Sequence, residues 1–374
     1  MPRNRVAERR NLESRKARRN VIKTIGAGLV MSGGLNTAGS VTGESSDGVR
    51  ISIRRSVDNP MTLEQANRLT IRAADQYRSQ VEADDPVGYT QRHSSHDTDV
   101  YAMVLVIRQG ETTRSYIGST SSDTPVNRRE VQKLHDRANK FEQSTDTNKS
   151  EVLVQANSSP FQATSDDGDE DGLNGDWNVL ADNFRDILHG DYGLKQVRTR
   201  VGEKVVDGSF YSGLFTKHIN SPGVNEKDDS RYRQYLSWQQ HDHGYYEAGN
   251  NDLTDYEPDT NKSGSFTFTA TIGFSGIAPT LEVQTEYSPV KVSRTDESTL
   301  SDEIASWKWD YNENPNWDGA TKDPDIFEPI STARSETPPS SGDAVLGESI
   351  SAEWYNPFTG TFSPKYTSTD LVFY

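Results

Sequence analysis

One run of eight consecutive residues constrains the fold of this chain more than any other segment. Residues 100–107 read Val-Tyr-Ala-Met-Val-Leu-Val-Ile, and an apolar run of this length with several β-branched residues is typical of a buried strand. Residues 109–111 (Gln-Gly-Glu) predict a tight turn, and the turn leads into a second strand over residues 113–117. We therefore expect a β-hairpin near residue 110, with the neighbouring segments packed against it.

The segments on either side of this hairpin alternate between strand and helix periodicity. Residues 49–53 alternate as a strand, and apolar residues recur at helical spacing over residues 62–82 and again over 127–143. A last strand is predicted over residues 151–156. The resulting order β-α-β-β-α-β predicts a ferredoxin-like (βαββαβ) module of helices on a small antiparallel sheet, which we assign to an α+β domain at residues 45–157.

The rest of the chain reads mainly as β-structure. An acidic linker is predicted over residues 158–176, and a β-rich, β-sandwich-like domain over residues 177–374. A short amphipathic helix is predicted at its start, over residues 177–188. Residues 266–274 and 281–287 alternate apolar and polar side chains as two strands. The predicted fold class is therefore α+β, with a ferredoxin-like module followed by a mainly antiparallel β-sandwich-like domain.

Composition excludes several classes of site. The chain has no cysteine, which removes disulfides, zinc–thiolate sites, iron–sulfur clusters and thiol catalysis. The net charge of −16 divides into +7 for the first 40 residues and −23 for residues 41–374. The acidic part argues against a nucleic-acid partner, because phosphates would be repelled.

The basic first 40 residues have the layout of an export signal. Arg18 and Arg19 precede Asn-Val-Ile-Lys, and a short apolar, glycine-containing stretch follows at residues 24–31. This segment resembles the twin-arginine (Tat) signal, with Ala38 and Ser40 as small residues for a peptidase. The resemblance implies a signal segment at residues 1–40, folding before translocation, and an extracellular or cell-surface location.

The acidic remainder is similar in composition to secreted proteins of halophilic archaea. The whole chain contains 33 Asp against 23 Glu, and residues 41–374 contain 12 Lys against 19 Arg. Salt at 1 M shortens the screening length to about 3 Å, so dense like charge costs little there. An ordinary acidic secreted protein is the alternative. The resemblance implies a protein that folds best in concentrated salt.

The linker contains a candidate calcium site. Alternate carboxylates followed by Gly172 resemble the opening of a calcium-binding loop, in which acidic residues stand at positions 1, 3 and 5. Asn178 stands where that loop has its bidentate Glu, so the pattern departs from the motif, and a solvated acidic linker is the alternative. The candidate Ca²⁺ ligands are Asp167, Asp169, Asp171 and Asp176.

Two groups of histidines are weaker candidates for a metal site. His241 and His243 are two residues apart, so on a strand both would lie on one face, as a two-histidine metal pair requires. His93, His96 and Asp97 form a second group in a predicted loop. Neither group has an evident third ligand, and hydrogen-bonded histidines are the alternative.

One further pattern partly resembles a nuclease motif. Tyr101, the Tyr-Ile-Gly at residues 116–118, Arg128 and His135 resemble the GIY-YIG signature, although the first glycine is missing. A hairpin of this composition produces Tyr-Ile-Gly at a strand end without any catalytic role, and a strongly acidic protein would repel a nucleic acid. Three sequons, at Asn148, Asn157 and Asn261, are candidates for glycosylation in an exported protein.

Three classes of function remain open. No nucleophile elbow, phosphate loop, dinucleotide fingerprint or zinc-protease helix is present, which favours a non-enzymatic secreted or cell-surface protein that binds a surface glycan or a protein partner. The first alternative is a membrane-active effector (toxin or bacteriocin-like) that uses the amphipathic hairpin at residues 265–288 and has the membrane as its partner. The second alternative is an extracellular hydrolase with an unrecognised site. No cofactor other than Ca²⁺ is expected.

Overall fold

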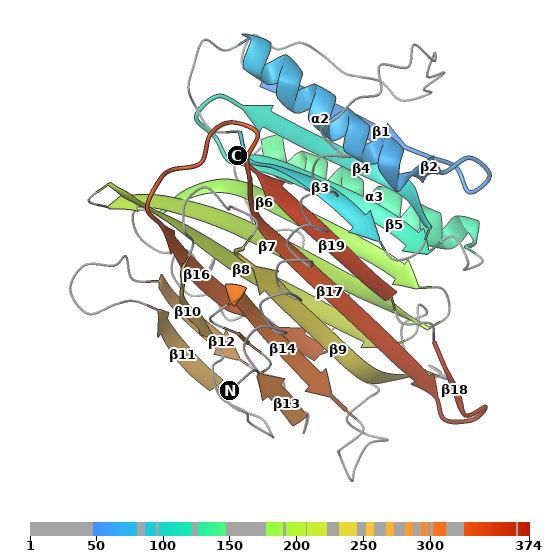
Figure 1. The fold of residues 1–374 in the computed structure, drawn as a ribbon. Coiled ribbons are helices and arrows are strands. Elements are labelled where there is room, and N and C mark those ends of the chain that lie inside the picture. Colours follow the sequence, from blue (N-terminus) through green and yellow to red (C-terminus); the bar gives the residue numbers. More distant parts are fainter. Residues whose placement is uncertain are drawn as a thin grey trace, which may run out of the picture. The chain divides into compact units, whose positions relative to one another are not determined.

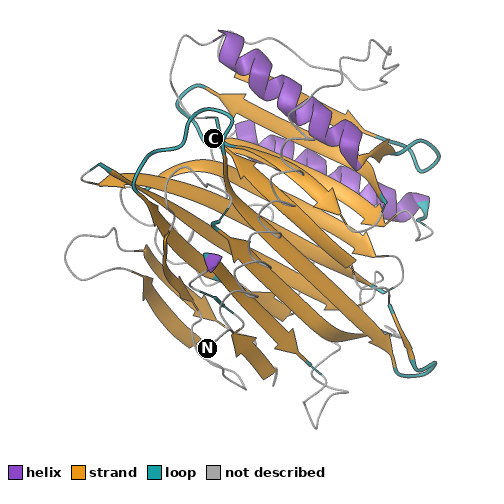
Figure 2. Cartoon of the chain, in the orientation of Figure 1, coloured by secondary structure: helices purple, strands orange, loops and turns teal. Residues whose placement is uncertain are grey.

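The computed structural model places most of the described chain in strands (Figures 1 and 2). Within the described part, the two helices are α2 (Leu63–Gln80) and α3 (Arg128–Asp146). Residues Gly39–Tyr374 belong to one compact unit. The structure describes residues 48–80, 87–94, 97–121, 126–146, 177–189, 192–206, 208–222, 232–244, 252–257, 267–272, 281–286, 293–296, 298–299, 302–311, 325–363 and 366–374.

The largest sheet, sheet A, runs in the order β1-β4-β5-β6-β7-β8-β16-β10, with β2 paired to β4 and β15 paired to β8. Neighbouring strands are antiparallel except for β5 and β6, which are parallel. Its strands are β1 (Gly48–Arg54), β2 (Met61–Thr62), β4 (Thr98–Arg108), β5 (Thr113–Ser121), β6 (Asn178–His189), β7 (Gly193–Val206), β8 (Ser209–Pro222), β10 (Asp252–Glu257), β15 (Asp325–Phe327) and β16 (Ile330–Ser335).

Sheet B runs in the order β13-β14-β9-β17-β19-β3, with β18 paired to β17, and β11 and β12 form a separate two-stranded sheet, sheet C. The strands of sheet B are β3 (Tyr89–Ser94), β9 (Arg233–Asp242), β13 (Ser293–Asp296), β14 (Ile304–Asp310), β17 (Ala344–Asn356), β18 (Thr361–Phe362) and β19 (Tyr366–Phe373). Those of sheet C are β11 (Thr267–Ile272) and β12 (Leu281–Glu286).

Sheets A and B pack face to face, as the β-sandwich prediction requires. Val201 and Leu214 of sheet A share a buried cluster with Leu346 and Val372 of sheet B. Ile187 of β6 and Val197 of β7 pack in the same way against Ile350 of β17. Inward-facing residues of two stacked sheets interdigitate in this manner, so the sandwich core is confirmed.

The predicted ferredoxin-like arrangement is not confirmed. Met103, Leu105 and Ile107 of β4 pack in the cluster that contains α2, whereas Val104 and Val106 pack in the cluster that contains α3. Because alternate residues of a strand point to opposite faces, the two helices cover opposite faces of sheet A. A ferredoxin-like module carries both helices on one face. Sheet A also continues without interruption from β5 into β6, so strands from residues 45–157 and from residues 177–374 share it.

The two helices predicted before the acidic linker are confirmed, and the helix predicted after it is wrong. The helices expected over residues 62–82 and 127–143 are present as α2 and α3. The helix expected over residues 177–188 is wrong, because this segment is strand β6, with almost every residue buried. Its apolar side chains recur every four residues, a spacing that satisfies both a helical period and an even strand period. No described helix is long and apolar enough to cross a bilayer.

Candidate functional site

The space between sheets A and B contains charged side chains as well as apolar ones. Arg185 of β6 forms an ion pair with Glu348 of β17, and its Nη1 lies 3.3 Å from Oδ2 of Asp370 on β19. Arg92 of β3 contacts the same Asp370, with Nε 2.8 Å from Oδ1. All four side chains are at most 3% exposed. Two buried cations are thus balanced by two buried anions, and Arg185 joins the two sheets.

Glu348 extends this arrangement into a hydrogen-bonded network. Its Oε1 accepts hydrogen bonds from Oγ1 of Thr216 at 2.7 Å and Nε2 of Gln239 at 3.0 Å. Its Oε2 accepts a third from Oγ1 of Thr199 at 2.6 Å. The donors come from both sheets, because Thr199 and Thr216 belong to β7 and β8 and Gln239 belongs to β9. A buried carboxylate needs this degree of satisfaction to remain charged.

Histidines continue the network toward the far ends of β8 and β9. His241 Nδ1 and His243 Nε2 each lie 2.8 Å from the hydroxyl of Ser331, and His243 Nδ1 lies 3.1 Å from that of Ser212. We call the whole set the inter-sheet polar network. Its members are Arg92, Arg185, Thr199, Ser212, Thr216, Gln239, His241, His243, Ser331, Glu348 and Asp370.

Burial shifts the protonation of these groups. It lowers the pKa of His218 and His241 well below the ordinary value and that of His243 to about 3. Burial, with Arg185 nearby, lowers the pKa of Lys195 to about 7. Burial alone would raise the pKa of Asp370, but Arg185 and Arg92 lower it. The histidines are therefore neutral at pH 7. The side chains of the network join the two sheets, and because all of them are buried, none is exposed to a substrate.

The predicted histidine pair is brought together by the structure, but through a shared serine. His241 and His243 both contact Ser331, and within the described residues no group of three or more His, Asp or Glu side chains is arranged to hold a metal ion. His93 lies half-buried in β3, and burial lowers its pKa. The hydroxyl of Ser331 gives His241 and His243 a hydrogen-bonding partner inside the sandwich.

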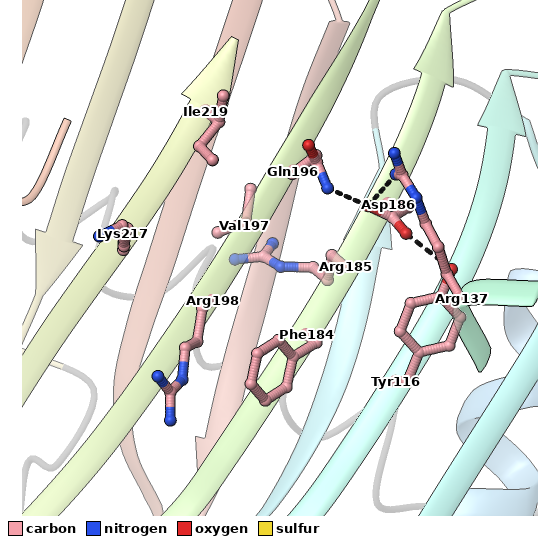
Figure 3. A pocket seen from close by; sticks show the side chains of 10 residues that line it. All are labelled: Tyr116, Arg137, Phe184, Arg185, Asp186, Gln196, Val197, Arg198, Lys217 and Ile219. Atoms are coloured by element: carbon pink, nitrogen blue, oxygen red, sulfur yellow. Dashed lines mark hydrogen bonds and ion pairs between the residues drawn. The ribbon is translucent and has the colours of Figure 1, made fainter. Parts of the chain in front are cut away.

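A small cavity lies beside α3 (Figure 3). Asp186 of β6 is its central acceptor, with hydrogen bonds from Tyr116 Oη at 2.7 Å and Gln196 Nε2 at 3.1 Å, and an ion pair to Arg137 at 2.8 Å. Arg198 and Lys217 also line the cavity, whose volume is about 30 Å³. A cavity needs roughly 10–15 Å³ to hold one water molecule, whereas ligand pockets have roughly 300–1,000 Å³. The cavity is too small for an organic substrate.

The residues of the nuclease-like pattern have packing roles. Tyr116 is buried under α3, where its hydroxyl contacts the carbonyl of Leu134 as well as Asp186. His135 Nε2 contacts the backbone carbonyls of Arg55 and Tyr101. These contacts fix α3 on the sheet and leave Tyr116 inaccessible to a phosphodiester.

Several predicted sites lie outside the described residues. They are the export motif Arg18 and Arg19, the calcium candidates Asp167, Asp169, Asp171 and Asp176, the sequons Asn148, Asn157 and Asn261, and His96.

Sheet C is the feature with the clearest functional geometry. Among the described strands, β11 and β12 pair only with each other. Alternate pairs of an antiparallel ladder lie on opposite faces, so the register separates the residues into two sets. One set consists of the pairs Phe268–Thr285, Ala270–Val283 and Ile272–Leu281, and the other of Thr267–Glu286, Thr269–Gln284 and Thr271–Glu282. Five of six residues are apolar in the first set, and all six are polar in the second.

The chain reaches this hairpin from an edge of one sheet and leaves it at an edge of the other. β10, which precedes the hairpin, is at the end of sheet A, and β13, which follows it, is at the end of sheet B (Figure 1). Tyr256 of β10 packs edge-on to Trp307 of β14, with ring centroids 6.2 Å apart. The hairpin is thus carried between two edges, and no described strand of the sandwich needs it to complete a ladder.

Comparison with known proteins leaves the family open. No family model matches the chain, and no curated protein matches it. Two similar solved structures are a "Pore forming protein" (9% identity, TM-score 0.29, 48% of this chain and 81% of the other) and "Clostridium perfringens delta-toxin" (12% identity, TM-score 0.31, 48% of this chain and 83% of the other). At these TM-scores the likeness assigns neither a fold nor a function to this chain.

Proposed function

We propose that the protein is a secreted, non-enzymatic effector that permeabilises lipid bilayers by inserting the β11–β12 hairpin. The observation that carries the proposal is the register of this hairpin, which divides apolar from polar residues in a sheet of its own. Strands of membrane β-barrels alternate in the same way, with apolar residues toward lipid and polar residues toward the lumen.

Insertion requires several copies of the chain. In hydrocarbon every backbone N–H and C=O must be paired, and a single two-stranded hairpin has two open edges. Hairpins from neighbouring copies can close these edges by forming a barrel. The smallest natural membrane barrels have about 8 strands, so we expect at least about four copies in each assembly.

The hairpin must also lengthen when it inserts. Each described arm has 6 residues, or about 20 Å at a rise of about 3.4 Å per residue. A spanning strand has about 9–11 residues. Residues 258–266 precede β11 and residues 287–292 follow β12, so the chain between β10 and β13 is long enough to extend both arms to a full span.

Release of the hairpin leaves the sandwich intact. Among the described strands, sheet C shares no ladder pairing with sheets A and B, so its departure breaks none of their backbone hydrogen bonds. The inter-sheet polar network meanwhile holds β6, β8, β9, β17 and β19 together. The molecule therefore combines two sheets that are joined to each other with one hairpin that, among the described strands, shares no ladder with them.

Export and salt adaptation belong to the same proposal. A Tat-type signal containing Arg18 and Arg19 would deliver the protein already folded, with the hairpin kept on the frame until a membrane is met. The charge of −23 on residues 41–374 is tolerated in molar salt, where repulsion is screened.

Release of a trapped dye from lipid vesicles in molar salt tests the function, with two matched variants. Ala270→Lys places a charge in the apolar set, which costs about 2–4 kcal/mol for each copy at the bilayer midplane. Thr269→Lys places the same charge in the polar set of the same strand. We expect the wild type and Thr269→Lys to release dye and Ala270→Lys to lose at least about tenfold in rate. No release by micromolar wild type would refute the function, and equal release by both variants would show that another element inserts.

A further inference from the structure

The turn between β17 and β18 exposes large apolar side chains. Phe358 is 77% exposed and Phe362 is 48% exposed. The described residues contain one other large exposed apolar side chain, Val205 at 57%. The turn projects beyond sheet B at the lower right of Figure 1. Exposed phenylalanines that neighbour one another in one turn mark an interaction site more often than a single exposed valine does.

The turn is held in one conformation, so the exposure is built into the fold. The side chain of Asn356 accepts hydrogen bonds from the backbone N–H of Phe358 at 3.0 Å and of Thr359 at 3.3 Å. Gly360 has φ 70°, a conformation that glycine adopts without strain. At the base, the backbone N–H of Trp354 donates to the hydroxyl of Ser363 at 2.9 Å. The backbone that carries Phe358 is therefore already ordered before binding, which lowers the entropic cost of binding.

Partly exposed tyrosines surround the two phenylalanines. The ring of Phe362 lies 4.7 Å from that of Tyr235 and 4.8 Å from that of Tyr355, measured between centroids. Tyr192 and Tyr232 form a second pair, at 4.7 Å. The strand register places these residues at one end of the sandwich, which we call the aromatic end. It consists of Tyr192, Tyr232, Tyr235, Tyr355, Phe358 and Phe362.

The turn also lacks charge. Residues 354–364 contain no Asp, Glu, Lys or Arg, in a chain of which 26% is charged. An uncharged loop with phenylalanine at its tip and tyrosine around its base matches the boundary between headgroups and acyl chains, where apolar rings are buried and phenol groups remain hydrated.

The aromatic end is also the end at which the proposed inserting hairpin joins sheet B. Tyr355 of β17 pairs with Arg233 at the start of β9, and Asp310 of β14 pairs with Leu236 a few residues further along. Ser293, the first residue of β13, pairs with Asp310. The chain therefore enters sheet B from the hairpin at the same end that carries Phe358.

We infer that the aromatic end binds the interface of a lipid bilayer, with Phe358 and Phe362 inserted below the headgroups and the tyrosines at their level. The inference rests on the proposed function and names its first step, because binding through this end brings the start of β13 and the attached hairpin to the membrane surface. The partner is the bilayer interface itself.

Flotation with phosphatidylcholine vesicles in molar salt tests the inference. In the double variant Phe358→Ser/Phe362→Ser, we expect bound protein to fall roughly tenfold or more, since both apolar rings that would be buried below the headgroups are removed. Val205→Ser is the matched control, because Val205 ends β7 at the opposite end of the sandwich. Thermal unfolding shows whether each variant is folded, because Phe362 packs on Tyr235 and Tyr355 and its replacement removes those ring contacts.

Flotation and dye release together separate this inference from the proposed function. Ala270→Lys should float with vesicles as the wild type does but release dye at least about tenfold more slowly, whereas the double phenylalanine variant should be reduced in both flotation and dye release. Flotation without dye release by the wild type would support the aromatic end and refute the effector function. Dye release together with undiminished flotation of the double variant would overturn the inference. Binding confined to vesicles that carry a glycolipid would also overturn it, in favour of a glycan partner.

Discussion

The sandwich core and the β11–β12 hairpin differ in how they are held. The core is joined across its two sheets by specific charged bonds, such as Arg185 with Glu348 and with Asp370, all buried. The hairpin has its own two-stranded ladder and no described strand partner in either sheet. One region is therefore fixed by interactions that are costly to break, and the other is attached by chain connections and packing.

This difference indicates that the buried ion pairs fix the position of one sheet relative to the other. Buried ion pairs are weak evidence for stability as such, because desolvation offsets much of their attraction. They are strongly selective for one arrangement, however, because an unpaired buried charge is far worse than a paired one. A frame built in this way resists sliding of one sheet over the other while a neighbouring hairpin rearranges.

The largest expected effect follows from removing one anion of the core. Glu348→Gln leaves Arg185 with Asp370 alone and removes the charge that accepts from Thr199 and Thr216. Breaking a buried pair in this way typically costs about 3–5 kcal/mol. Urea unfolding in constant molar salt should show that loss. Glu353→Gln, on the same strand but partly exposed, should lower the free energy of unfolding by about 1 kcal/mol or less, because water screens the interactions of a partly exposed carboxylate. An equal change in the free energy of unfolding for the two variants would mean that the charge of Glu348 does not hold the two sheets together.

The next effect is a loss of stability in acid. His218, His241 and His243 have pKa values below the ordinary value of 6.5, because burial disfavours the charged ring. Below pH 6.5 these histidines are protonated in the unfolded chain but remain neutral in the folded chain. Their contribution to the free energy of unfolding is therefore complete above pH 6.5 and is lost as the pH falls. Each histidine approaches a slope of about 1.4 kcal/mol per pH unit below about pH 5.5, and between pH 7.5 and 5.5 it averages about 0.7, or about 2 for three. Lys195, with a pKa of about 7, also makes the free energy of unfolding rise with pH, but over a higher pH range.

Urea unfolding between pH 7.5 and 5.5 measures this slope. His243→Gln should reduce it by about a third even if the variant is less stable at every pH, because the slope counts protons and not contacts. Dye release per folded molecule should not follow the same slope, since the three histidines are buried in the sandwich. A pH-independent free energy of unfolding would show that the histidines are not enclosed in solution.

Local patterns in the sequence predicted α2, α3 and the two hairpins, because these are set by periodicity within a short window. The same kind of pattern wrongly predicted a helix over residues 177–188, which form strand β6. The strand at residues 100–107 was also recognisable, and its unbroken apolar character already implied cover on both faces, which α2 and α3 provide. The alternation over residues 266–274 predicted β11. What these segments share is that nearby residues determine them.

The polar core could not be predicted, because its partners are far apart in the chain. Arg92 and Asp370 are 278 residues apart, and β3 joins β19 at the edge of sheet B. One local signal was available at β6, where Asp182, Asn183, Arg185 and Asp186 interrupt an otherwise apolar segment. Charges at adjacent positions of a strand require partners on both faces, which a helix with one solvated face would not need.

The smallest expected effect concerns the hairpin and tests its independence from the frame. Ala270→Lys should change the free energy of unfolding of the sandwich by less than about 0.5 kcal/mol, because among the described strands sheet C shares no ladder pairing with sheets A and B. The double variant Ala270→Lys/Glu348→Gln should then be additive within about 0.3–0.5 kcal/mol. The measurement is a double-mutant cycle by urea unfolding. A coupling energy above about 1 kcal/mol would mean that the hairpin and the core stabilise each other. In that case insertion would have to loosen the frame, and the two regions would be parts of one cooperative unit.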